Sequence, residues 1–204
     1  KLKEAGYLPW TIETHYKSLI DNYRGRTWKS VRNDMVALAH YIADGHQPLH
    51  LTVNHNGGMT DNPGVHFRYE MDLLKYYPDT YNHIAISPLP VEAFPIDSIN
   101  RRTFGFMIQS YVYVDSIHRA DIDCKDNRPE YDSAYYVCFE QRASNRLIKQ
   151  LTLAAHEIAS YWYSAWLDAG KPEMIISSES PHTDNIPLLS GNPPDKKEAM
   201  PIKA

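Results

Sequence analysis

The sequence predicts an all-α fold, and two observations carry this prediction. Apolar residues recur at the 3.6-residue period of an α-helix through most of the chain up to about residue 168. Turn signals are sparse, because only 9 of the 204 residues are glycine. A chain of this length can bury a core as one domain. We therefore expect a single helical bundle of about five helices, with a long proline-rich connection and a polar C-terminal tail.

The first two expected helices are separated by an Arg-Gly-Arg turn. One covers roughly residues 9–24, and the second runs from a cap at Thr27 to about Asp44 or Gly45. The second helix is apolar nearly all round, which is typical of a helix at the centre of a bundle. The Gln47-Pro48 dipeptide then bends the chain, because proline disfavours helix in the residue before it.

The rest of the chain is divided by prolines and by loops with Gly-Gly or Pro-Gly. We expect four further segments, which are a helix over about 65–77, an irregular connection over 78–95, a helix over roughly 96–122 and a long helix over roughly 132–168. Gly170 and Pro172 end the last helix. A helical domain over residues 1–176 thus precedes a polar, proline-rich tail over 177–204, which we expect to be extended or poorly ordered.

Charge and apolar content exclude some classes of protein. The formal net charge is −4 and there is no long basic stretch, which argues against broad contact with the phosphates of duplex DNA. No run of 18 apolar residues occurs, so we expect no transmembrane segment. Cys124 and Cys138 lie 14 residues apart, and they either form a disulfide in an oxidising compartment or stay reduced in the core.

Residues 40–70 hold five potential metal ligands, which are His40, Asp44, His50, His66 and Glu70. Two of the pairs are four residues apart, so each pair can share one face of a helix. A single pair of this kind is more often a hydrogen bond on a solvated helix face. Two pairs with a third histidine between them favour a metal site over satisfied core histidines, and imidazole with carboxylate suits zinc.

The motif is His40-x3-Asp44-x2-Gln47-Pro48-Leu49-His50, followed by Gly57-Gly58 and His66-x3-Glu70. It resembles the signature of the zinc-dependent phospholipase C / S1–P1 nuclease family, and the glutamate at position 70 resembles the phospholipase C side. The segments Leu8-Pro9-Trp10 and Trp162–Pro172 also resemble bacterial relatives. The resemblance covers about residues 6–172.

The resemblance implies a helical bundle that holds up to three Zn²⁺ ions and hydrolyses a phosphodiester. His40 and Asp44 would bind one zinc ion of a close pair, His66 and Glu70 the other, and His50 the third ion. Asp44 and Glu70 would be the carboxylates of the catalytic centre. Metal-activated water is then the nucleophile, and no side-chain nucleophile is required.

The family also uses an N-terminal tryptophan, an early histidine and an Asp/His pair upstream of the motif. None of them has a counterpart here, because Lys1 lies only 39 residues before His40. We expect these ligands and a signal peptide to belong to a segment upstream of Lys1. By resemblance the protein is bacterial and extracytoplasmic, meaning periplasmic, secreted or surface-anchored.

The expected substrate is a phosphodiester, either a phospholipid headgroup or nucleic acid, and no specific protein partner is expected. The phospholipase C-like activity is the first expectation. An S1/P1-type single-strand nuclease and a catalytically inactive extracytoplasmic binding relative are the alternatives.

Overall fold

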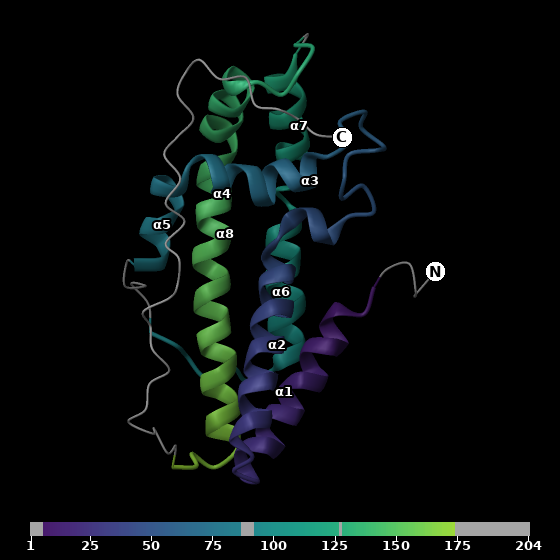
Figure 1. The fold of residues 1–204 in the computed structure, drawn as a ribbon. Helices are drawn as coiled ribbons and strands as arrows, with labels where there is room; N and C mark the ends of the chain where they lie inside the picture. Colours follow the sequence, from purple (N-terminus) through teal and green to yellow (C-terminus); the bar gives the residue numbers. More distant parts are fainter. Residues whose placement is uncertain (1–5, 87–91, 127, 174–204) are drawn as a thin grey trace. The chain divides into compact units, whose positions relative to one another are not determined.

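The computed structural model describes residues 6–86, 92–126 and 128–173 (Figure 1). These residues form helices joined by turns and loops, with no strand among them. The expected all-α fold is confirmed. The predicted tail over 177–204 lies outside the described residues.

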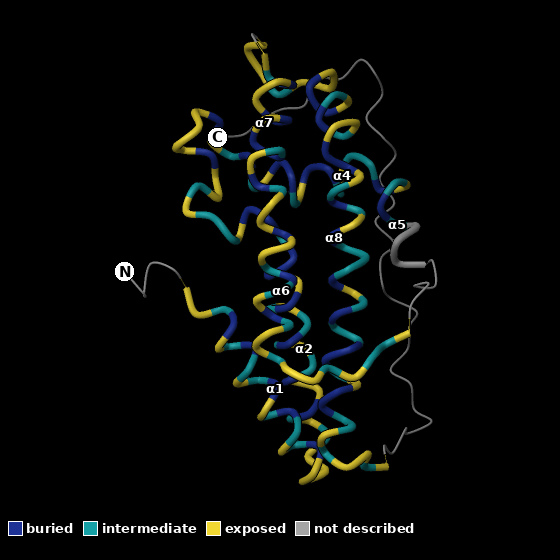
Figure 2. The backbone as a smooth tube through the Cα atoms, turned by 180° about the vertical axis from the view of Figure 1, so that it is seen from behind, coloured by how far each residue is buried: buried dark blue, intermediate teal, exposed yellow. Residues whose placement is uncertain are grey.

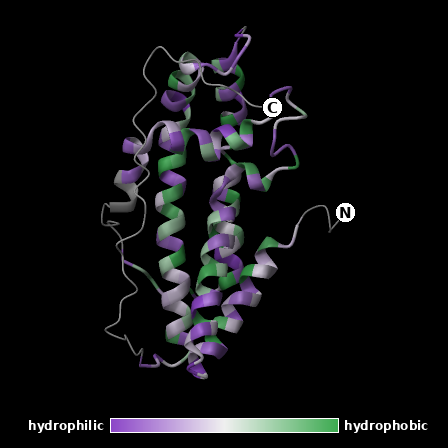
Figure 3. Ribbon diagram, viewed as in Figure 1, coloured by the Kyte–Doolittle hydropathy of each residue, from purple (hydrophilic) through white to green (hydrophobic). Residues whose placement is uncertain are grey.

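The helical elements follow one another in this order: α1 (Leu8–Arg24), α2 (Trp28–His46), the 3-10 helix η1 (Pro48–Leu51), α3 (Val65–Phe67), the π-helix η2 (Arg68–Asp72), α4 (Leu73–Tyr76), α5 (Pro78–Ile86), α6 (Ile99–Tyr111), α7 (Val114–Lys125) and α8 (Ser133–Asp168). The predicted helices at 9–24 and 132–168 match α1 and α8 closely. Polar and apolar residues alternate along α8 (Figure 3).

Two predicted segments differ from the structure. The connection predicted to be irregular over 78–95 begins with α5, since Pro78 fits the first turn of a helix, where its missing N–H costs nothing. Residues 87–91 lie outside the described part. The helix predicted over 96–122 is two helices, α6 and α7, and the break at Val112-Tyr113 carries neither glycine nor proline to mark it.

The helix that the sequence shows to be apolar nearly all round is α2, and the structure buries only part of its surface. Buried and exposed positions follow one another along the helices (Figure 2). In α2, one face holds the buried residues Val31, Leu38 and Ile42, while Val36 on another face is 64% exposed. The side chain of His40 is 68% exposed. The helix is therefore amphipathic in its environment, with one buried face and one exposed face.

Contacts divide the described residues into two compact units. The first unit contains residues up to 46, 92–107 and 153–173. Its apolar core includes Ile12, Leu38 and Phe106. A Cβ atom at Gly45 would lie 2.5 Å from the ring of Phe106, so only glycine allows this close packing.

The second unit contains residues 47–86 and the described residues of 108–152. Its core includes Leu49, Tyr69 and Phe139, all fully buried. Cys124 and Cys138 form a disulfide, which decides between the two states that the sequence left open. The bond ties the end of α7 to the beginning of α8. All three donors of the site described next belong to this unit.

Candidate metal centre

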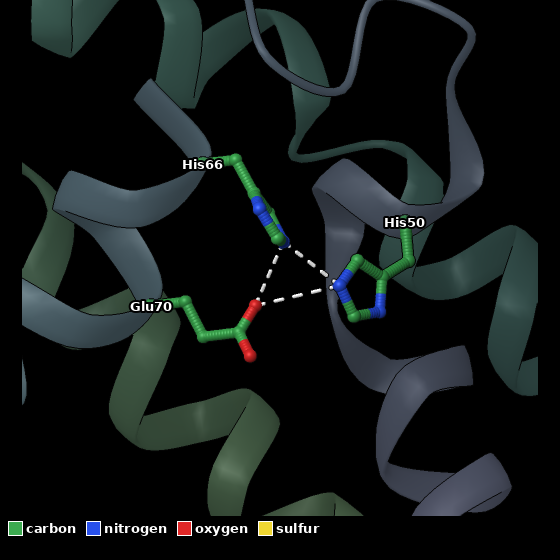
Figure 4. A group of neighbouring side chains, drawn as sticks. All are labelled: His50, His66 and Glu70. Atoms are coloured by element: carbon green, nitrogen blue, oxygen red, sulfur yellow. Dashed lines mark hydrogen bonds and ion pairs between the residues drawn. The ribbon is translucent and has the colours of Figure 1, made fainter. Parts of the chain in front are cut away.

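Three side chains of the second unit direct donor atoms toward one another (Figure 4). Nε2 of His50 and Nε2 of His66 are 2.8 Å apart. Oε2 of Glu70 lies 2.8 Å from Nε2 of His66 and 3.4 Å from Nε2 of His50. The three side chains are between 27% and 38% exposed, so the group is reachable from solvent and yet partly enclosed. We call it the three-donor group.

His50 is positioned by the bend that Pro48 starts. Gln47 is extended before the proline, with φ −81° and ψ 108°, and the 3-10 helix η1 then begins. The next residue, Leu49, is fully buried in the core of the unit. Leu49 anchors η1 in the core. The adjacent His50 is therefore directed toward His66, which lies in α3 at the other end of the loop that follows η1.

A π-helix places the other two donors. His66 lies in α3 and Glu70 in η2, whose i→i+5 hydrogen bonds widen the helix locally. The buried side of this turn holds Tyr69, which is fully buried, and Arg68. Such π-helical insertions occur often at functional sites, because they re-aim side chains that a regular helix would direct elsewhere.

A buried ion pair fixes the inner side of the π-helix. Nε of Arg68 lies 2.8 Å from Oδ1 of Asp121, and Nη2 lies 2.9 Å from Oδ2 of the same carboxylate. Asn62 and Tyr135 also donate hydrogen bonds to Asp121. A Cβ atom at Gly64 would lie 2.7 Å from Nη1 of Arg68, and Gly64 has φ +88°, so glycine suits this position on both grounds.

Gln47 supports the carboxylate of the three-donor group. Its Nε2 donates a hydrogen bond of 3.1 Å to Oε2 of Glu70. Its Oε1 accepts a hydrogen bond of 3.2 Å from the backbone N–H of Leu49, which fixes the orientation of the amide. Hydrogen bonds of this kind orient metal ligands and tune their basicity.

The charge states of the group suit metal binding. The hydrogen bond from His50 lowers the pKa of Glu70 to about 2, with Gln47 and the charge of His66 acting in the same direction against the effect of burial. Burial lowers the pKa of His66, and the charge of Glu70 opposes this effect. An anionic carboxylate and a neutral imidazole are the forms that bind a metal ion.

The donor atoms fit a zinc ion. Zinc bonds of about 2.0–2.2 Å at a tetrahedral centre hold ligand atoms about 3.3 Å apart. The observed separations of 2.8–3.4 Å are close to this value, and a small outward movement of the two imidazoles meets it. Two histidines and one glutamate form a known catalytic zinc set, in which the fourth position is left to water or substrate.

The other predicted ligands form a pair of their own in the first unit. Nε2 of His40 lies 3.4 Å from Oδ2 of Asp44, one turn apart on α2. Among the described residues, neither belongs to a group of three converging donors. The resemblance assigns His50 to a different zinc ion from His66 and Glu70. In the structure, the donor atoms of all three residues converge in one group.

The sequence-based prediction missed four features of the site and its surroundings, namely the role of Gln47, the π-helix, the position of His55 and the burial of His46. The role of Gln47 could have been inferred from its place in the His-x3-Asp-x2-Gln-Pro-Leu-His motif, whereas the π-helix has no comparable sequence signal. The ring of His55 lies 6.1 Å from that of His66. His46 is only 3% exposed, stacks on Phe106 and places Nδ1 2.8 Å from the carbonyl oxygen of Ile42, so it is a core residue.

Comparisons with protein-family models, curated proteins and solved structures found no match to this chain. Membership of the zinc-dependent phospholipase C / S1–P1 nuclease family thus stays a prediction from the motif at residues 40–70. Among the described helices, none combines the length and the apolar character needed to cross a membrane.

Proposed function

We propose that the protein is a zinc-dependent phosphodiester hydrolase, most similar in activity to phospholipase C. The observation that carries the proposal is the convergence of His50, His66 and Glu70, with donor atoms 2.8–3.4 Å apart. This set matches the two-histidine, one-glutamate ligation of catalytic zinc sites. The resemblance of the motif selects phosphodiesters from among the substrates that such a site could hydrolyse.

The residues of the chain have separate tasks in this reaction. His50, His66 and Glu70 hold the ion, and Gln47 keeps the Glu70 carboxylate directed at it through the 3.1 Å hydrogen bond. Bound zinc polarises the phosphate oxygens, lowers the pKa of a water molecule and stabilises the leaving oxygen. The partial exposure of the group leaves room for a substrate phosphate to approach.

His40 and Asp44 extend the proposal to a second ion, and up to three Zn²⁺ ions per chain follow from the resemblance. Two donors 3.4 Å apart bind zinc more weakly than three do, so we expect the ions to differ in affinity. The disulfide between Cys124 and Cys138 supports the proposed extracytoplasmic location, because disulfides persist mainly in oxidising compartments.

The proposal is tested with the full chain loaded with zinc. Bound zinc is measured by atomic absorption, and hydrolysis is followed with bis(p-nitrophenyl) phosphate, a short-chain phosphatidylcholine and single-stranded DNA. We expect hydrolysis of the chromogenic diester and of the phospholipid. Hydrolysis of DNA in place of the phospholipid would select the nuclease alternative.

Two variants and a control make the test specific. His50→Ala and Glu70→Ala should each abolish hydrolysis, because each removes a ligand from a set of three. His156→Ala is the control, since this histidine lies outside the three-donor group and its Nε2 is 3.0 Å from the carbonyl oxygen of Glu92. Full activity in both site variants would refute the proposal, whereas zinc binding without any hydrolysis would favour the inactive binding relative.

A further inference from the structure

A groove in the second unit is lined by cationic side chains of α7 and α8. It has a volume of about 280 Å³ and is formed by Ser116, Arg119, Ala120, Asp123, Arg142 and Arg146. None of these residues belongs to the three-donor group, so the groove is a feature independent of the proposed hydrolase activity. Three of the six side chains are arginines and only one is acidic.

The charges of the groove are not balanced by its own residues. Nη1 of Arg142 forms an ion pair of 2.7 Å with Asp123. Arg146 donates instead to the backbone carbonyl of Arg142, which carries no charge. Among the described residues, no carboxylate lies within ion-pair distance of Arg119. The groove therefore carries an excess of two positive charges on a chain whose net charge is −4.

The two walls of the groove are held together by covalent and buried contacts. The disulfide joins Cys124, next to Asp123 on α7, to Cys138, one turn before Arg142 on α8. The hydroxyl of Tyr135 on α8 also donates a hydrogen bond to the buried Asp121 on α7. Because the backbones are fixed, less ordering is required of the arginines when they bind a ligand.

We infer that this groove binds a phosphate-bearing anion. Guanidinium groups offer planar pairs of N–H donors that match two oxygens of one phosphate, and each such bond is assisted by charge. The volume suits a phosphate, a pyrophosphate or a small phosphoester and is below the range of most sites for drug-sized ligands. The ligand is held by Arg119 and Arg146 from opposite helices, and Arg142 joins them when it exchanges Asp123 for the ligand.

Isothermal titration calorimetry with pyrophosphate and with glycerol phosphate tests this inference. The full chain is first freed of divalent cations by dialysis, so that phosphate bound through a metal ion at the three-donor group does not contribute. We expect saturable binding with one site per chain, and binding that weakens as the salt concentration is raised. Binding of both ligands indicates a site for a phosphoester headgroup, and binding of pyrophosphate alone indicates a site for the free anion.

Variants separate this site from unspecific attraction. Arg119→Ala should lower the affinity about tenfold, because it removes a charged donor that has no other ion pair. Arg32→Ala removes the same charge from an exposed position on α2 and should leave the affinity unchanged. Asp123→Asn should raise the affinity several-fold, since it frees Arg142, and a gain of this kind cannot result from misfolding.

Three results would overturn the inference. One is the absence of saturable binding of both ligands. Another is an equal loss of affinity in Arg119→Ala and Arg32→Ala. The third is an Asp123→Asn variant that binds no better than the unaltered chain. Because metal-free protein is used, failure here leaves the proposed hydrolase activity untouched, and failure of the hydrolase assay leaves this site untouched.

Discussion

The pairs His66–Glu70 and His40–Asp44 have the same spacing in the sequence and different surroundings in the structure. The first pair is separated by 2.8 Å and the second by 3.4 Å. The side chain of His66 is 30% exposed, whereas that of His40 is 68% exposed. An i, i+4 spacing thus brings a histidine close to a carboxylate in both units, and it does not decide whether the pair becomes part of a larger group.

The difference comes from what surrounds each pair. Glu70 receives hydrogen bonds from Gln47 and His50, which come from a distant stretch of the chain. The turn that carries Glu70 is held from inside by the ion pair of Arg68 and Asp121. His40 instead lies on a regular helix, where the centroid of its ring is 5.3 Å from that of the neighbouring Tyr41 ring. A third donor and a fixed backbone therefore distinguish the three-donor group.

The largest expected effect is that of removing the buried carboxylate behind the π-helix. Asp121→Ala leaves Arg68 buried without its partner, and we expect a loss of about 3–5 kcal/mol of unfolding free energy. Urea denaturation measures this loss. Asp115→Ala changes an exposed carboxylate of the same helix and should stay within about 0.5 kcal/mol of the unaltered chain. Equal stability of the two variants would show that the ion pair does not support the turn.

A direct comparison of the two pairs uses their zinc affinities. His50→Ala removes one of three converging ligands, so we expect the tightest zinc site to weaken more than the roughly 10–100-fold typical of outer-shell changes. His40→Ala should leave that tightest site unchanged and remove only a weaker ion. Competition titrations with a chromophoric chelator measure both. If His40→Ala weakened the tightest zinc site as much as His50→Ala does, the His40–Asp44 pair would contribute to that site as much as the three-donor group, which contradicts the comparison.

Replacing the supporting amide should have a smaller effect on the same site. Gln47→Ala keeps all three ligands and removes the hydrogen bond to Glu70, so zinc affinity should fall about 10–100-fold. Gln47→Glu offers a control of similar size that loses the N–H donor and adds a charge. The same chelator titration applies, and unchanged affinity in Gln47→Ala would show that the 3.1 Å contact has no influence on the ligand.

The smallest effect concerns a carboxylate of the first unit. Burial raises the pKa of Asp34, but hydrogen bonds from His15, Ser18 and Asn22 outweigh it and lower the pKa below its ordinary value of 3.8. The ionised group therefore stabilises the fold above that value, and the contribution is lost as the pH falls through the lowered pKa.

Asp34→Asn should accordingly cost about 1–2 kcal/mol near neutral pH and less in acid, at about pH 3. Urea denaturation at both pH values gives the two differences. A cost that stayed constant or grew toward acid would contradict the sign of this pKa shift. Zinc affinity at the three-donor group serves as the control and should not change in this variant.

The sequence predicted the helices best where their periodicity is long and their ends are marked. The helix expected at 9–24 is α1, and the helix expected at 132–168 is α8, which ends before Gly170. The prediction of one helix over 96–122 was wrong, because no glycine or proline divides α6 from α7. The helix predicted over about 65–77 matches the helical run from Val65 to Tyr76, but nothing in this run indicates its π-helical turn.

The candidate site could also be predicted only in part from the sequence. Residue type and spacing selected His50, His66 and Glu70 as candidate ligands, because ligands of zinc belong to a short list and helix periodicity pairs positions four apart. They could not decide that His50 joins this pair, because that contact depends on where η1 packs against the core through Leu49. Nor could they indicate that Gln47 would bond to Glu70, 23 residues later in the chain.

The sequence by itself determined the helical class, the ends of the longest helices and the residue types of the candidate metal site. Each of these depends on local periodicity, on capping or on the chemistry of one side chain. Only the tertiary structure decided which donors converge, which histidines are buried and that Cys124 and Cys138 form a disulfide. These outcomes depend on packing between segments distant in the chain, such as Arg68 on Asp121, and no local pattern encodes them.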